Sequence, residues 1–365
     1  MFYKNIVASA ALLTGVLAAP TPSALPQGFP NPNTTELEAI QKAAGGELSN
    51  APPPASVNAS SVPVFQLINF NENFEVAFFN SLVYNITNDV PGFQIPWGGE
   101  KASLLNILTS VLAQEELHAL NAGGVLTHFN AFAPPPCVYK FPTTDLASAI
   151  ALSQTFTSLV LGTLQDAAEG LAINGDHGPV RTVASVIGEE GEQNGFFRSL
   201  LNRKPAEKPF LTTSVATFLF SSLQDFVVSC PFDLNQIPIP RLPTIKVLSG
   251  NSGSDVQPQD QTLTFSVDLT GVEAAKPYYG SPEAANALFI TYLTGQNLPV
   301  SKPINSIAWS GEVMTFQADF PFEEFTMSGL TVAALTTANN YTGPDDIAAS
   351  TLAAPALIQV NDPIL

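Results

Sequence analysis

The chain has 365 residues, of which 45% are hydrophobic and only 12% are charged, and its formal net charge is −18. This length exceeds one ordinary domain and predicts two, with enough apolar material for buried cores. Such an acidic surface repels phosphate backbones and the sequence holds no basic cluster, which argues against a nucleic-acid partner.

Residues 1–18 have the features of a secretory signal peptide. Lys4 supplies the positive charge, and an apolar run that is too short to span a bilayer follows at Ile6–Leu17. No later segment has about twenty uninterrupted apolar residues, and the C-terminus lacks the hydrophobic tail of a lipid-anchor signal. We therefore expect a secreted protein, extracellular or in the cell wall, without a membrane anchor.

Residues 19–60 are rich in Pro, Ala, Ser and Asn and include Pro52–Pro54. Such a composition buries too little apolar surface to offset the loss of chain entropy. We predict a disordered leader, with a transient helix near residues 36–44. Sequons for N-glycosylation occur in this leader and beyond it, at Asn33, Asn58, Asn85 and Asn340.

Residues 61–231 show the period of amphipathic helices. Four long helices are expected, the first from about residue 62 and the others over residues 99–129, 144–174 and 180–202. A shorter apolar segment follows at about 211–228. Each long helix carries acidic or polar residues on the face that is otherwise apolar. These positions are Glu72 with Glu75, Glu115 with His118, Asp166 with Glu169, and Glu190 with Gln193.

The pair Glu115 and His118 is the clearest of these, because it continues an apolar stripe through Leu104, Leu108 and Val111. Burying several carboxylates without partners would cost several kcal/mol each. A divalent cation offsets that cost, and carboxylates with imidazole suit iron, manganese or zinc. The alternative is a polar network without metal. Three further glutamates fall off the core faces and are expected to be surface charges: Glu116, Glu189 and Glu192.

The chain has two cysteines, Cys137 and Cys230. In an oxidising compartment one pair can form one disulfide, which would close a loop of roughly ninety residues. Two separate buried thiols are the alternative.

The pattern changes after residue 231. Residues 232–243 are a proline-rich linker, and residues 244–365 alternate between apolar and polar positions with turn residues between the runs. Several short strands at this spacing predict an antiparallel β-sandwich. The expected strands are 244–248, 261–269, 287–293, 313–320, 329–335 and 356–360.

Three motifs carry a resemblance to a known family: residues 67–79 (LINFNENFEVAFF), 114–119 (QEELHA) and 188–198 (GEEGEQNGFFR). The helical half resembles the ferritin-like domain of secreted fungal proteins, and the whole chain most resembles the fungal late sexual development proteins. The resemblance implies an α+β multidomain chain, in which a ferritin-like four-helix bundle precedes the β-sandwich.

In ferritin-like two-metal sites, two helices each give a carboxylate and two give Glu-x-x-His. Glu115 and His118 match this pattern, but Gln193 stands where the second histidine is expected. An amide oxygen is a weak ligand, which argues against a complete two-metal centre. Two alternatives are left: one ion held by Glu72, Glu115, His118 and Glu190, or an empty site whose acids are linked by hydrogen bonds. Glu75, Gln193, Asp166 and Glu169 are weaker candidates.

Two functions follow from these observations. The first is a secreted ferritin-like protein of fungal sexual development or stress response, which binds one iron or manganese ion in its core. The second is a non-catalytic structural or adhesive protein of the cell wall, with a vestigial site that holds no metal and a sandwich that contacts glycan or protein. The sequence leaves open whether the protein is an enzyme, in which case it would be a metal-dependent oxidoreductase, and it does not indicate an oligomeric state.

Overall fold

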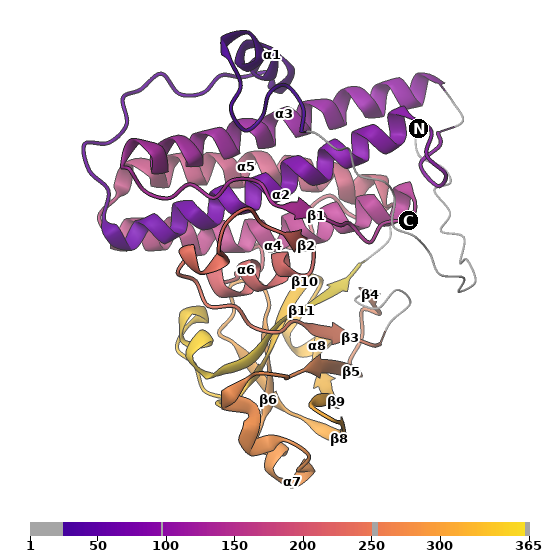
Figure 1. The fold of residues 1–365 in the computed structure, drawn as a ribbon. Coiled ribbons are helices and arrows are strands. Elements are labelled where there is room, and N and C mark those ends of the chain that lie inside the picture. The colour runs from indigo at the N-terminus through magenta and orange to yellow at the C-terminus, as the bar shows by residue number, and fades with distance from the viewer. Residues whose placement is uncertain (1–24, 96–97, 250–254, 362–365) are drawn as a thin grey trace. The chain divides into compact units, whose positions relative to one another are not determined.

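The structure is a computed structural model that describes residues 25–95, 98–249 and 255–361, so the predicted signal peptide lies outside the described residues. Helices dominate the first part of the chain and strands the second (Figure 1). The helices are α1 (Thr34–Ala44), α2 (Val62–Thr87), α3 (Gly98–His128), α4 (Leu146–Ile173), α5 (His177–Leu200), α6 (Ala216–Gln224), α7 (Pro282–Ala285) and α8 (Phe322–Phe325). The strands are β1 (Val138–Tyr139), β2 (Val227–Ser229), β3 (Ile245–Val247), β4 (Asp255–Val256), β5 (Gln261–Asp268), β6 (Phe289–Leu293), β7 (Val300–Pro303), β8 (Asn305–Ser310), β9 (Val313–Phe320), β10 (Gly329–Thr336) and β11 (Thr351–Val360).

The chain forms two compact units. The first contains the described residues up to Leu152, together with Ala168–Val186 and Phe226–Ile239. The second contains Ser153–Ala167, Ile187–Asp225 and the described residues from Pro240 onward. Helices α1, α2 and α3 therefore belong to the first unit and strands β3 to β11 to the second, while α4 and α5 each contribute residues to both.

Helix α1 stands where the sequence predicts a disordered leader. Asn33 and Glu36 form a capping box in which each side chain accepts a hydrogen bond from the other's backbone nitrogen, and Gly45 ends the helix in the left-handed conformation. Ile40 is fully buried, and the Ser110 hydroxyl of α3 donates a 2.7 Å hydrogen bond to the Ala43 carbonyl. Local capping and one buried anchor thus order a segment whose overall composition is typical of disorder.

The docking of α1 leads to a first prediction, which concerns Ile40. Because truncating a buried isoleucine costs about 2–5 kcal/mol, Ile40→Ala should release α1 from α3 in a large fraction of molecules. Trypsin should then cut after Lys42, an exposed residue of α1, many times faster than in the parent protein. Glu38→Ala, which alters an exposed position of the same helix, is the control. Equal cleavage rates in all three proteins would contradict the docking of α1.

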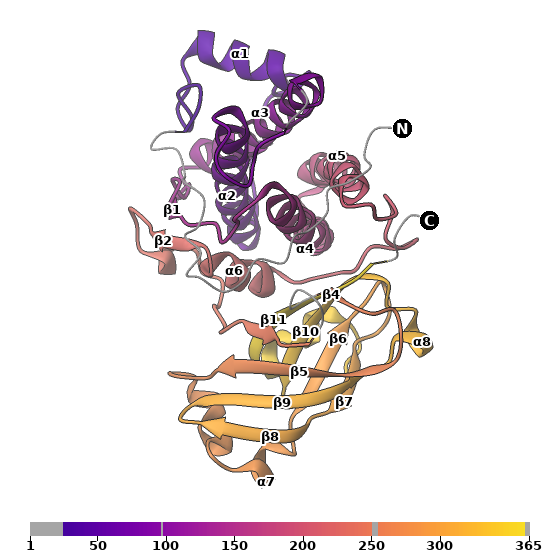
Figure 2. The ribbon, with the colours of Figure 1, turned by 90° about the vertical axis from the view of Figure 1, so that its right-hand side faces the viewer.

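Helices α2 and α3 form the core of the first unit and pack against each other (Figures 1 and 2). Proline in the first turn of α2 is compatible with helix initiation. The amide nitrogen of Asn69 donates a 3.0 Å hydrogen bond to the carbonyl of Ala119 in α3. Phe74 contacts an aromatic cluster with Tyr139, Phe141 and Phe226, at ring-centroid distances of 5.1 to 5.7 Å. This packing holds the polar residues of α2 at fixed positions against α3.

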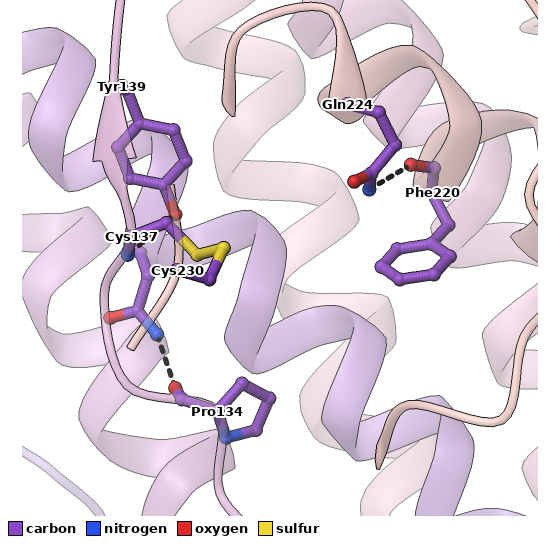
Figure 3. The surroundings of a disulfide bond; sticks show 7 residues. Pro134, Cys137, Tyr139, Phe220, Gln224 and Cys230 are labelled. Carbon is purple, nitrogen blue, oxygen red and sulfur yellow. Dashed lines mark hydrogen bonds between the residues drawn. A yellow bond between two sulfur atoms is a disulfide. The ribbon is translucent and has the colours of Figure 1, made fainter. Parts of the chain in front are cut away.

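The predicted disulfide between Cys137 and Cys230 is confirmed (Figure 3). It joins positions 93 residues apart and lies beside the β1–β2 pair, in which Val138 is opposite Ser229. The Cys137 backbone nitrogen donates a long hydrogen bond of 3.4 Å to the Tyr139 hydroxyl. The bridge thereby closes the strand pair onto the core of the first unit.

The strands of the second unit form two sheets, with the orders β4-β11-β10-β6-β7 and β3-β5-β9-β8 (Figure 2). Apolar residues of both sheets share one core, as expected from period-two alternation: Leu263, Phe265 and Phe316 from one sheet, and Ile290 and Ile358 from the other. The prediction of a mixed α and β chain with antiparallel sheets is confirmed, with one departure: β4 pairs with β11 in parallel.

A buried polar cluster connects helical and strand segments inside the second unit. Arg198, with a side chain only 2% exposed, donates a 2.7 Å hydrogen bond to the Lys204 carbonyl and lies 3.8 Å from the Glu207 carboxylate. Glu207 accepts hydrogen bonds from the Ser158 hydroxyl and from the backbone of Leu330. At Gly329 φ is +70°, and an added Cβ would lie 2.0 Å from Glu207, so only glycine fits there.

The sequons differ in accessibility. Asn33, Asn58 and Asn340 are exposed, whereas Asn85 is only 1% exposed within α2. A buried asparagine inside a packed helix cannot carry a glycan in the folded protein, so the structure does not support the prediction at Asn85.

Helix α4 is the one described helix that is long and apolar enough to span a bilayer. However, 72% of its most apolar window is buried inside the protein, and the core helix of a globular protein has the same length and composition. Gln154 and Ser158 on this helix are buried and hydrogen-bonded to each other.

Candidate metal centre

Helix α2 places carboxylates in the protein interior. Glu72 and Glu75 are each 1% exposed, on a helix that also buries Asn69, Asn71 and Asn73. A carboxylate at such a position loses its hydration, which is costly unless a partner replaces the water. The question for each buried acid of α2 is therefore which group compensates its charge.

Helix α3 supplies the partner of Glu72. Glu115 is fully buried, and the side chain of His118 is 16% exposed. Nδ1 of His118 lies 3.0 Å from Oε2 of Glu115 and 3.6 Å from Oε2 of Glu72. Since residues three apart on a helix lie on the same face, α3 presents the Glu115 carboxylate and the His118 imidazole together toward Glu72.

Glu190 of α5 completes a group of four with Glu72, Glu115 and His118. Each residue offers one ligand atom, and these four atoms lie within 4.8 Å of one another. Ligand atoms of one divalent ion lie about 2.0–2.4 Å from it, so two of them are at most about 4.8 Å apart. The separations therefore match those around a single ion. The cluster predicted from the sequence is brought together by the fold.

The protonation of the cluster reflects its burial. Burial raises the pKa of Glu72 to about 7, although the nearby His118 lowers it. For His118, burial disfavours the imidazolium, but the Glu115 and Glu72 carboxylates outweigh burial and raise the pKa of His118 well above its usual value. Without a metal ion the cluster therefore retains protons near neutral pH.

The donor set also fits a cation. Within the described part of the chain, neither carboxylate oxygen of Glu72 has a hydrogen-bond partner, and neither has Oε1 of Glu115. These buried oxygens can only accept when ionised, so protons or a positive ion must compensate them. Three carboxylates and one imidazole form a hard ligand set that suits divalent iron or manganese.

The weaker candidates lie outside this group of four. Glu75 accepts a 2.7 Å hydrogen bond from the Asn71 amide, and Glu169 is exposed to solvent. Asp166 accepts a 3.0 Å hydrogen bond from the backbone nitrogen of Ala216, where α6 begins. The amide nitrogen of Gln193 donates a 2.8 Å hydrogen bond to Glu189. Asp166 therefore caps the start of α6. The amide of Gln193 is hydrogen-bonded to Glu189, one turn earlier on the same helix.

Glu116 is the buried acid that the sequence pattern misplaces. It was expected to be a surface charge, but it is fully buried, neither of its carboxylate oxygens has a hydrogen-bond partner in the described residues, and burial raises its pKa to about 8. The buried face of α3 is wide here and includes the consecutive residues 111–113. That run of consecutive apolar residues was the available signal, since a helix covered from one side buries a narrower stripe.

Comparison of the sequence with protein-family models finds no match, and no curated protein matches it.

Proposed function

We propose that this protein holds one divalent transition-metal ion in its helical interior, between Glu72, Glu115, His118 and Glu190. The observation that carries the proposal is the convergence of four ligand atoms within 4.8 Å, three of them from buried carboxylates. Iron or manganese fits this oxygen-rich set better than a metal that prefers thiolates. The proposal is metal binding and does not extend to turnover as an oxidoreductase.

As part of the same proposal, we infer that the helices form a ferritin-like four-helix bundle. The Glu-x-x-His pair on α3 and single carboxylates on α2 and α5 are the ligands that a ferritin-like four-helix bundle would contribute to one ion. The resemblance to the fungal late sexual development proteins supports a role in sexual development or stress response. The disulfide and the exposed sequons support an extracellular or cell-wall location.

The second candidate function is a non-catalytic structural or adhesive protein of the cell wall. Gln193 favours it, because this residue replaces the second histidine of a two-metal site and its amide already bonds Glu189. In that case the acidic cluster is vestigial and protonated, and the β-rich part would contact a glycan or a protein partner.

Elemental analysis of the secreted protein tests the metal site. After equilibration with iron(II) or manganese(II) and removal of excess, the parent should hold about one ion per chain, since one group of four ligands is present. The double variant Glu115→Ala/His118→Ala should hold none, because it removes half of the ligand set.

Glu169→Ala is the matched control, since it removes an exposed glutamate outside the group of four. It should retain the metal content of the parent. Parent protein that binds neither ion at neutral pH would overturn the proposal and favour the structural role. Equal metal content in parent and double variant would show that the ion lies elsewhere.

A further inference from the structure

The proposed metal centre reaches solvent at one of its four ligands. Glu72 is 1% exposed, and Glu115 and Glu190 are fully buried. The side chain of His118, in contrast, is 16% exposed. An ion exchanges with solvent where the centre is accessible, so its route lies beside His118. An element that covers α3 next to His118 would therefore control the rate of this exchange.

Helix α1 packs on α3 one turn before His118 (Figure 2). The Ser110 hydroxyl donates a 2.7 Å hydrogen bond to the carbonyl of Ala43, and the Gln114 amide donates one of 3.4 Å to the carbonyl of Ala44, the last residue of α1. Ser110, Gln114 and His118 follow one another at intervals of four residues, so they form one row along α3. Since side chains of a helix lean toward its N-terminus, the imidazole of His118 lies over the turn of Gln114, where α1 ends.

Few contacts hold α1 on α3. Among the described residues 25–60, only Phe29 and Ile40 are buried. Helix α1 has 11 residues, and an isolated helix shorter than about 12–15 residues is marginal in water. The hydrogen bond from Gln114 is long, at 3.4 Å. Detachment of α1 therefore costs much less free energy than unfolding of the whole protein.

The chain after α1 allows this helix to leave α3 without moving α2. The backbone nitrogens of Gly46 and Leu48 donate to the carbonyl and side-chain oxygens of Gln41, so the turn after α1 folds back on the helix. Residues 49–56 are all exposed and belong to no helix or strand. Residues 34–48, the α1 strap, can therefore detach as one piece on an exposed connection.

We propose that the α1 strap is a gate that controls the exchange of the metal ion past His118. The gate rests on the metal site of the proposed function. The strap supplies none of the four ligands, so its opening changes how fast the ion enters and leaves but not how tightly the ligands hold it. Slow exchange keeps a bound ion in place when the concentration of free metal around the protein falls.

Release of manganese(II) from the loaded full chain to an excess of a coloured chelator measures the exchange rate. Ile40→Ala should speed this release at least about tenfold, because truncation of a buried isoleucine raises the population of the open strap. Glu38→Ala, at an exposed position of the same helix, should release the ion at the rate of the parent. The metal content and the dissociation constant should be the same in all three proteins. Equal release rates in Ile40→Ala and the parent would overturn the proposal.

Ile86→Ala separates the gate from a general loosening of the helices. Ile86 is a fully buried isoleucine of α2, fourteen residues after Glu72, which is about 21 Å along the helix. The substitution removes the same atoms as Ile40→Ala but leaves the strap in place. It should therefore keep the release rate within about twofold of the parent. Equal acceleration by the two variants would show that loosening of the helices, and not the strap, sets the rate.

Hydrogen–deuterium exchange of the metal-free chain measures the opening of the strap without any metal. Amides of residues 34–48 should exchange faster than those of α2 and α3 in the parent, and faster again in Ile40→Ala. Exchange of the strap as slow as that of α3 would contradict an independent gate. A parent chain that binds no manganese would refute the metal site itself. A chain that binds manganese, and whose strap opens in Ile40→Ala without faster release, would refute the gate alone.

Discussion

Replacement of Arg198 by methionine should lower the free energy of unfolding by about 3–5 kcal/mol, because it leaves Glu207 as an uncompensated buried charge. The two side chains are 2% and 3% exposed, and NH1 of Arg198 lies 3.8 Å from Oε2 of Glu207. Methionine retains much of the apolar length of arginine, so the loss reports the charge and its hydrogen bonds more than the packing. Urea denaturation, followed by far-ultraviolet circular dichroism, measures the change.

A double variant tests whether the loss of stability comes from the unpaired charge of Glu207. The double variant Arg198→Met/Glu207→Gln removes both charges and should recover a large part of the loss, since a neutral amide can still bond Ser158. Arg181→Met, an exposed arginine on the same helix, is the control and should change stability by about 0.5 kcal/mol or less. A loss below about 1 kcal/mol in Arg198→Met would show that the buried pair is not coupled.

The alternation of apolar and polar residues was sufficient to predict some strands of this protein but not others. β9 begins and ends where the alternation predicts it, at Val313–Phe320, because one face is core and the other is not. β8 was not predicted: Asn305–Ser310 is mostly exposed, and it lies at the edge of its sheet, so it needs few apolar residues. β7 was missed at the edge of the other sheet, where its burial alternates weakly.

In the candidate site, too, some residues were predictable from the local sequence pattern and others were not. Glu72, Glu115, His118 and Glu190 were predictable because each interrupts an apolar stripe at helical spacing. Asp166 interrupts such a stripe as well, yet it bonds the first turn of α6, fifty residues later in the chain. Helical spacing identifies a buried polar residue but does not identify its partner. The prediction that Glu116 is a surface charge was wrong for a related reason. The width of the buried face of a helix depends on how many neighbouring elements cover the helix, and the spacing of residues along one helix does not give that number.

Loss of the disulfide should be the other large effect. In the chain-entropy model, a bridge between residues 93 positions apart stabilises the folded protein by about 4–5 kcal/mol, since it restricts the unfolded chain. The double variant Cys137→Ser/Cys230→Ser should therefore unfold at markedly lower urea concentration than the oxidised parent. The parent treated with a reducing agent should unfold at the concentration observed for the double variant, because both lack the same constraint.

Ser229→Ala is the control for local disturbance, because Ser229 is the last residue of β2, directly precedes Cys230 in the chain and is exposed. It should leave stability within about 0.5 kcal/mol of the parent. If the double variant lost less than about 1 kcal/mol, restriction of the unfolded chain by this bridge would not be a main source of stability. The stabilisation of the helical part would then rest on packing between α2 and α3 and on the aromatic cluster around Phe74.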